Sequence, residues 1–162
     1  GIELSEYAKY CDDITFCLSK GLGCPVGSIL SGDKEFIHQA RRYRKMLGGG
    51  MRQIGYLAAA GIYALENHVE RLKEDHENCK LIRDAVASTS WARVLTYGTN
   101  ILFFTSDSYD ISKIVKKFND DGVMVLCECN ACRVVTNIGI SQKDAQEIAN
   151  YIKSFDPESI NG

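Results

Sequence analysis

The sequence lacks the features that mark membrane, secreted and nucleic-acid-binding chains. Its 19 Lys and Arg residues are nearly balanced by 21 Asp and Glu residues, and the formal net charge of −2 gives no basic field to attract nucleic acid. Its apolar runs are too short to cross a bilayer. Residues 1–20 contain no basic start followed by an apolar stretch, as a signal peptide would. We therefore expect a cytoplasmic protein with neither a membrane nor a nucleic-acid partner.

An initiator methionine is also absent. The sequence begins at Gly1 and reads like an internal stretch of a longer sequence, which suggests a fragment or a processed chain. Its 162 residues, 45% of them hydrophobic, are nonetheless enough for an ordinary globular domain with a real core.

The seven cysteines follow no pairing pattern. An odd count with irregular spacing argues against a disulfide framework, and reduced thiols in a cytosolic protein are the simpler interpretation. Cys127, Cys129 and Cys132 are close enough in sequence to suggest a metal site, but a structural zinc site usually needs four ligands and no histidine lies nearby. We expect these three to be buried strand cysteines and no metal to bind, with metal binding as the less favoured alternative.

Hydrophobic periodicity predicts two pieces joined by a long helix. The predicted strands are 14–18, 26–30, 94–97, 101–104, 123–126 and 133–136. The predicted helices are 34–47 with Asp33 as its N-cap, 53–67, 68–88, 110–118 and one opened by a capping box at Ser141. The apolar face of 53–67 is rich in small residues, which would let another helix or a subunit pack closely. Residues 1–65 are interpreted as the end of a larger α/β domain and residues 66–89 as a connecting helix. Residues 90–162 are interpreted as a small α+β domain with one sheet and helices on one face.

Lys20 directly follows a predicted strand and precedes the glycines Gly21 and Gly23. A lysine at a strand end can project into a cleft, where desolvation makes its amine a better nucleophile, and the glycines allow a ligand to approach the backbone. Most lysines after strands are solvated turn residues, so this pattern alone is weak.

Two further patterns involve cations. Basic residues from Arg41 to Lys45 precede the glycines at 48–50 and then Arg52, and such a stretch can present cations and backbone N–H groups to a phosphate. A solvated helix end, where basic residues are favoured, is the alternative.

Arg133 lies among apolar strand residues and needs a carboxylate partner. A carboxylate of the protein is favoured over one from a substrate.

These patterns, in this order, resemble the low-specificity L-threonine aldolases, which are pyridoxal-phosphate (PLP) enzymes. The resembling stretches are CLSKGLGCPVGS at 17–28, RKMLGGGMRQ at 44–53, LAAAGIYAL at 57–65, RLKEDH at 71–76 and RVVT at 133–136. The resemblance covers nearly the whole chain, and the long continuous pattern is much more specific than any single motif.

The resemblance implies the C-terminal portion of the aspartate-aminotransferase-like fold, fold type I: the end of the large PLP-binding α/β domain followed by a small α+β domain. It implies that Lys20 forms the Schiff base with PLP. Lys45 and Arg52 would lie near the cofactor phosphate, reaching it from a neighbouring subunit. Arg133 would bind the α-carboxylate of an amino-acid substrate by a two-pronged contact. A homo-oligomer, dimer or tetramer, is expected.

The implied reaction cleaves L-threonine or L-allo-threonine to glycine and an aldehyde. In this fold the ring-stacking histidine, the carboxylate on the pyridine nitrogen and the phosphate-cradling loop come from upstream of the lysine. We therefore expect this chain to need a missing N-terminal part as its partner. A related PLP β-eliminating lyase, or a non-catalytic partner or remnant chain, remains the alternative.

Overall fold

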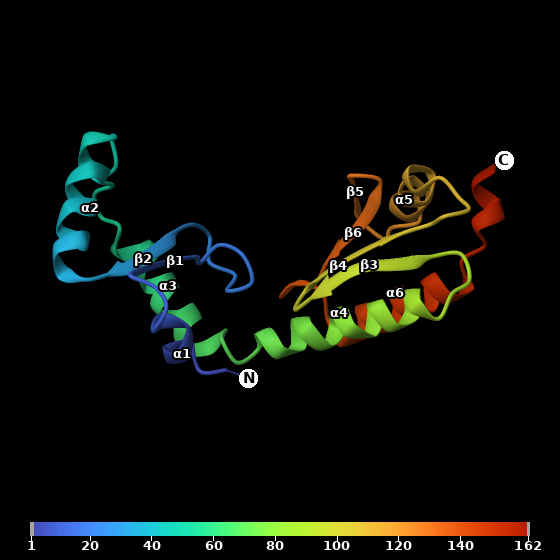
Figure 1. The fold of residues 1–162 in the computed structure, drawn as a ribbon, viewed down its shortest axis with the longest axis horizontal. Coiled ribbons are helices and arrows are strands. Elements are labelled where there is room, and N and C mark those ends of the chain that lie inside the picture. The colour runs from blue at the N-terminus through green and yellow to red at the C-terminus, as the bar shows by residue number, and fades with distance from the viewer. Residues whose placement is uncertain (1, 162) are drawn as a thin grey trace. The chain divides into compact units, whose positions relative to one another are not determined.

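A computed structural model describes residues 2–161 and divides the chain into two compact units, Gly1–Glu70 and Arg71–Gly162 (Figure 1). The sequence interpretation treated residues 66–89 as a connecting helix. In the structure, helix α4 (Leu72–Ala87) instead contributes buried residues such as Ile82 and Val86 to the core of the second unit. The division therefore falls before this helix.

The first unit contains a β-hairpin, which one helix precedes and two helices follow in the sequence. Its elements are α1 (Leu4–Ala8), β1 (Asp13–Cys17), β2 (Ser28–Gly32), α2 (Lys34–Met46) and α3 (Gly55–Asn67). The strands pair antiparallel, with Asp13 opposite Gly32 and Cys17 opposite Ser28. As expected, Asp33 caps α2, its Oδ1 accepting a hydrogen bond from the N–H of Phe36 at 2.7 Å. The short helix α1 was not predicted.

Hydrophobic side chains of the first unit are mostly exposed. Among its described residues only five are buried, namely Leu18, Leu22, Cys24, Gly61 and Ala64. Leu47, just after α2, is 88% exposed and Tyr56 in α3 is 87% exposed. A unit that buries so little apolar surface cannot offset the entropy of ordering its own chain. It therefore needs further protein surface packed against it.

The second unit is an antiparallel sheet with helices packed on it. Its remaining elements are β3 (Arg93–Gly98), β4 (Ile101–Thr105), α5 (Ile111–Asp120), β5 (Leu126–Glu128), β6 (Ala131–Val135), α6 (Gln142–Ser154) and the 3₁₀ helix η1 (Pro157–Asn161). The strand order is β3-β4-β6-β5. Helices α4 and α6 run side by side along this sheet (Figure 1).

Alternation along β4 and β6 separates the two faces of this sheet. Leu102 and Phe104 of β4 lie opposite Val134 and Cys132 of β6, and all four are buried in one core with residues of α4, α5 and α6. Aromatic rings concentrate in this core, where Phe118 meets other rings at centroid distances of 5.0 to 6.5 Å. The predicted α+β unit therefore has a complete core of its own.

The predicted strand at 123–126 is wrong in position, because β5 comprises Leu126–Glu128. The side chain of Asn119 explains the shift. Its Oδ1 accepts a hydrogen bond from the Val125 N–H at 2.7 Å, and its Nδ2 donates to the Val125 carbonyl at 3.1 Å. The backbone of Val125 is therefore paired with a side chain of α5 and not with a neighbouring strand.

The expected burial of the three late cysteines is confirmed only for Cys132. Cys127 and Cys129 are exposed, because β5 is the edge strand and Cys129 lies in the turn after it. Cys129 and Asn130 both have positive φ, 49° and 58°, as the two central residues of a type I′ hairpin turn do. The capping box, in contrast, forms as predicted, with Ser141 and Asp144 bonded reciprocally.

Replacing Phe118 with alanine tests the core of the second unit. Because Phe118 is 1% exposed, Phe118→Ala should lower the free energy of unfolding by about 3–5 kcal/mol. The chain has one tryptophan, Trp91, which lies in this core, so its fluorescence during urea unfolding reports on the second unit. Phe103→Ala, on the opposite face of the sheet, is the matched control. Equal losses in the two variants would contradict this description of the core.

Candidate active site

Lys20 lies on a loop, residues 18–27, which leaves β1 and returns to β2. The backbone closes this loop at its base, where the Leu18 N–H donates to the Gly27 carbonyl at 2.9 Å and the Cys24 N–H donates to the Leu18 carbonyl at 3.0 Å. Gly23, with φ of 70°, turns the chain so that its N–H donates to the Lys20 carbonyl at 2.8 Å. The side chain of Lys20 is exposed. The lysine amine is therefore presented outward from a loop whose backbone is fixed.

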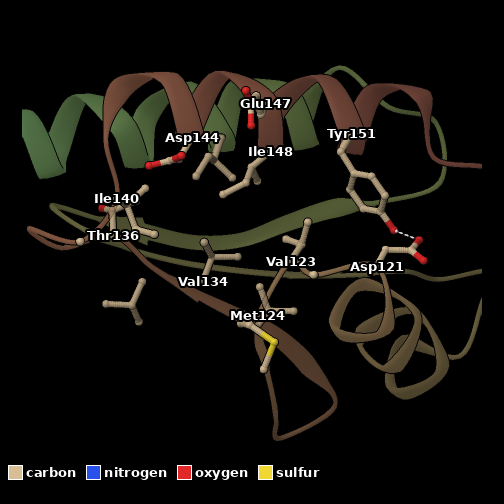
Figure 2. Close-up of a pocket in the computed structure, with 15 residues that line it drawn as sticks. Asp121, Val123, Met124, Val134, Thr136, Ile140, Asp144, Glu147, Ile148 and Tyr151 are labelled. Atoms are coloured by element: carbon tan, nitrogen blue, oxygen red, sulfur yellow. Dashed lines mark hydrogen bonds between the residues drawn. The ribbon is translucent and has the colours of Figure 1, made fainter.

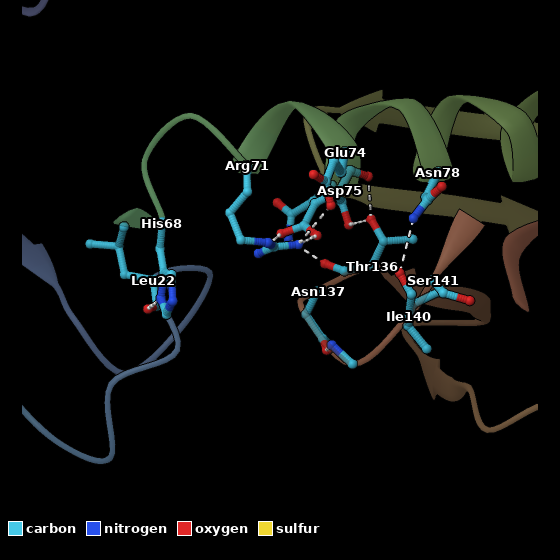
Figure 3. A network of polar contacts seen from close by, with 12 residues as sticks. Leu22, His68, Arg71, Glu74, Asp75, Asn78, Thr136, Asn137, Ile140 and Ser141 are labelled. Atoms are coloured by element: carbon cyan, nitrogen blue, oxygen red, sulfur yellow. Dashed lines mark hydrogen bonds and ion pairs between the residues drawn. The ribbon is translucent and has the colours of Figure 1, made fainter. Parts of the chain in front are cut away.

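Helix α3 packs against this loop. A Cβ on Gly61 would lie 3.2 Å from Cδ1 of Leu18, which leaves little room for a side chain there. The Cys24 thiol donates to the Ala60 carbonyl at 3.6 Å. Nδ1 of His68, just past the helix end, lies 2.7 Å from the Leu22 carbonyl oxygen (Figure 3). The small residues of α3, which the sequence suggested would receive another helix or a subunit, thus receive the lysine loop.

Lys45 and Arg52 flank the glycine-rich end of α2. The Nζ of Lys45 lies 3.6 Å from the position of a Cβ on Gly50, whose φ is 142°. Both basic side chains are exposed. Figure 1 shows this end of α2 at the far end of the first unit from the loop at 18–27. The end of α2, which carries Lys45, therefore does not reach the lysine loop within one chain.

Arg133 lies on the face of the sheet opposite to the core. Its cross-strand neighbours are Phe103 in β4 and Leu126 in β5, and its Nε is 3.7 Å from Oε2 of Glu128. The favoured carboxylate of the protein is thus present, but the pair is partly exposed and loosely spaced. Such a pair contributes little to stability and leaves the guanidinium able to exchange partners.

A buried polar network that the sequence interpretation missed fixes the end of β6. Asp75 is 1% exposed and pairs with Arg71, whose Nη2 donates to Oδ1 at 2.6 Å (Figure 3). The Thr136 hydroxyl donates to the Asp75 carbonyl at 2.6 Å, and Nδ2 of Asn100 donates to the Thr136 carbonyl at 2.9 Å. A buried carboxylate needs such partners. The spacing of Arg71 and Asp75, four residues apart on a helix, was the sequence signal for this pair.

A cleft of about 550 Å³ opens beside α6 in the second unit, and none of the four predicted site residues lines it (Figure 2). Asp144 and Glu147 lie along it, and the Tyr151 hydroxyl donates to Oδ2 of Asp121 at 2.7 Å. Burial, and next this hydrogen bond, raise the pKa of Tyr151 above its usual value. Neither Lys20 nor Arg133 lines the cleft, which therefore is not the site that the sequence predicts.

The described part of the chain has neither a cluster of metal-ligating side chains nor a membrane-spanning helix. Among residues 2–161, no three or more His, Cys, Asp or Glu side chains gather as they would around a metal ion. No helix in this part of the chain is long and apolar enough to cross a membrane.

Solved structures with this fold identify its class. The chain is similar to the threonine aldolase of Leishmania major, with 14% identity and a TM-score of 0.72 over 94% of this chain and 46% of that chain. It also resembles a variant of the lyase C-DES with glycine linked covalently to its PLP cofactor, with 13% identity and a TM-score of 0.51 over 63% and 28% of the two chains. The fold is therefore that of a portion of a fold-type-I PLP enzyme.

The chain belongs to the beta-eliminating lyase family, whose family model matches residues 1–108. It is 42% identical to the low specificity L-threonine aldolase of Escherichia coli K12 over 155 residues, which cover 96% of this chain and 46% of that protein. The chain thus spans about half the length of the curated relatives that it matches. Together these comparisons indicate pyridoxal phosphate as the cofactor.

Substitution of Gly61 tests the support of the lysine loop. Gly61→Val should press on Leu18 and destabilise the packing by about 1–3 kcal/mol, as overpacking does. In the complete protein, where further surface packs on this unit, we expect trypsin to cleave after Lys20 faster in this variant than without the substitution. Gly55→Val, also in α3 but with nothing within 4 Å of its added Cβ, is the matched control. If both variants were cleaved at the same rate, the contact between Leu18 and Gly61 would not support the loop.

Proposed function

We propose that the complete protein is a PLP-dependent aldolase that cleaves L-threonine and L-allo-threonine to glycine and an aldehyde, with Lys20 as the lysine that binds the cofactor. The observation that carries this proposal is the outward-facing amine of Lys20 on a loop fixed by Leu18 and by α3. The 42% identity to a low specificity L-threonine aldolase across nearly the whole chain supports the choice of reaction.

The amine of the lysine loop suits the aldehyde of PLP, and the glycines beside it leave room for the ring. Lys20 supplies a primary amine, which is the group that condenses with an aldehyde. Gly21 and Gly23 have no side chains to block a flat ring beside that amine. When bound, PLP supplies a sink for the electrons released as a carbon–carbon bond breaks. The loop positions the amine.

Lys45 and Arg52 are proposed to contact the cofactor phosphate in a neighbouring subunit. The C-terminal end of α2, which carries Lys45, lies at the far end of the first unit from the loop at 18–27, and this supports a role in another copy of the site. Exposed apolar side chains on the same segment, such as Leu47 and Tyr56, provide surface for such an interface. We therefore infer a homo-oligomer, dimer or tetramer, in which each site uses two subunits.

Arg133 is proposed to bind the α-carboxylate of the amino-acid substrate. A planar guanidinium can bind both carboxylate oxygens at once and so orients the amino acid as well as binding it. Because Glu128 holds Nε at 3.7 Å in a partly exposed pair, a substrate carboxylate could replace it at modest cost. The buried network around Thr136 would then keep this strand end in place during binding.

The remaining assignments follow from the same proposal. Residues 1–65 are assigned to the C-terminal part of the large PLP-binding domain, and residues 90–162 to the small domain. A further N-terminal part would cover the lysine loop and supply the contacts to the ring. The free cysteines suit the reducing cytoplasm, where we place the enzyme.

A related β-eliminating lyase is the second candidate, because the matching family model carries that description. The two reactions differ in their products. An aldolase releases glycine and acetaldehyde from threonine, whereas an eliminating lyase releases ammonia and a keto acid. Analysis of the products formed by the complete enzyme separates them.

Reduction with borohydride tests the role of Lys20. In the complete enzyme supplied with PLP, mass spectrometry of the digested protein should find the phosphopyridoxyl group on Lys20. Lys20→Ala should lose this label, because no other amine is held in its place, whereas Lys45→Ala should keep the label on Lys20. A label that persists in Lys20→Ala would reject the assignment.

Substitution of Arg133 tests the carboxylate contact. Arg133→Ala should raise KM for threonine at least about thirtyfold, as expected when a charged hydrogen-bonded contact worth 2 kcal/mol or more is lost. PLP labelling of Lys20 should be unchanged. Arg133→Lys keeps the charge without the two-pronged geometry, and its KM should lie between those of the unaltered enzyme and Arg133→Ala. An unchanged KM in both variants would count against this role.

A further inference from the structure

The β5–β6 hairpin places two cysteines directly opposite one another. Cys127 in β5 and Cys132 in β6 are Cα partners in the antiparallel register, one pair in from the turn. The type I′ turn at Cys129 and Asn130 fixes this register, since the turn type and the loop length determine which residues pair. Both thiols are free. The two cysteines are therefore held as neighbours by the backbone.

This register suits a disulfide. Opposite residues in antiparallel strands have Cα atoms roughly 4.5–5.5 Å apart. A disulfide requires a Cα separation of about 4.4–6.8 Å. The Cys127 thiol also contributes to raising the pKa of the Cys132 thiol, as expected for groups near one another. Little backbone movement is needed to join them.

The two thiols differ in access. Cys127 is exposed on the edge strand, whereas Cys132 is fully buried, and burial is the main cause that raises its pKa to about 12. An external reagent can therefore reach Cys127 but not Cys132. Such a pair has one thiol that reacts first and a second that can react only with its neighbour.

We propose that Cys127 and Cys132 form a reversible disulfide when the protein meets a small-molecule disulfide such as oxidised glutathione. The thiolate of Cys127 attacks one sulfur of glutathione disulfide, which forms a mixed disulfide and releases one glutathione thiolate. Cys132 loses its proton to water and attacks the Cys127 sulfur, which expels the second glutathione thiolate. Two protein thiols are oxidised and one glutathione disulfide is reduced to two thiols. This chemistry does not depend on the proposed function.

Thiol mapping tests the proposal on the chain as it is. The folded protein is treated with oxidised glutathione, unfolded, alkylated and digested with trypsin, and the peptide at 118–133, which contains Cys127, Cys129 and Cys132, is analysed by mass spectrometry. We expect this peptide to lose two thiols without retaining glutathione, and to regain both on reduction with dithiothreitol.

Serine substitutions at the two exposed cysteines of this hairpin show which cysteines form the disulfide. Cys127→Ser should abolish oxidation of Cys132, while Cys129→Ser, the matched control in the turn, should leave the loss of two thiols intact. A stable glutathione adduct on Cys127, with Cys132 still alkylated after unfolding, would overturn the proposal. So would a bond that disappears in Cys129→Ser, since that bond would involve the turn cysteine.

Discussion

The close approach of Leu18 to Gly61 determines how the first unit is built. A Cβ at position 61 would lie 3.2 Å from Cδ1 of Leu18, so a side chain there would push Leu18 out of its present place. The same support includes Ala60, which accepts a hydrogen bond from the Cys24 thiol. A loop fixed in this way holds its lysine without using the lysine side chain itself. The amine is left free for chemistry because the packing is provided by its neighbours.

The two units bury apolar surface in opposite ways. The second surrounds Phe104 and Phe118 with sheet and helices and has a core of its own. The first buries Leu18 and Leu22, which belong to the lysine loop, and leaves both strands of its β1–β2 hairpin exposed. Hydrophobic burial is the main favourable term in folding. The first unit therefore buries too little apolar surface to be stable by itself, whereas the second has a core of its own.

Features with local causes could be predicted from the sequence. Asp33 and Ser141 cap helices where the sequence indicated, because capping needs only residues a few positions apart. The predicted strand at 123–126 was misplaced because Asn119, from the preceding helix, occupies the backbone of Val125. The exposure of Cys127 was missed because sequence does not tell which strand lies at a sheet edge.

The candidate site, like the fold, was predictable where its causes lie close together in the sequence. The position of Lys20 after a strand and before glycines was readable from the sequence, and the loop bears this out. The contact of His68 with the Leu22 carbonyl spans 46 residues, and no local pattern reveals it. The small residues of α3 indicated close packing but not what would pack there. Sequence thus located Lys20 on its loop better than it located the residues that hold the loop.

The alternation of β6 separates two kinds of evolutionary constraint. Cys132 and Val134 face the core, and changes there alter the stability of the whole unit. Arg133 and Val135 face the other way and take no part in that core. Mutations at the outward positions can accumulate while folding is preserved. A strand of this kind lets selection change what a protein recognises one residue at a time, with the neighbouring residues acting as a fixed scaffold.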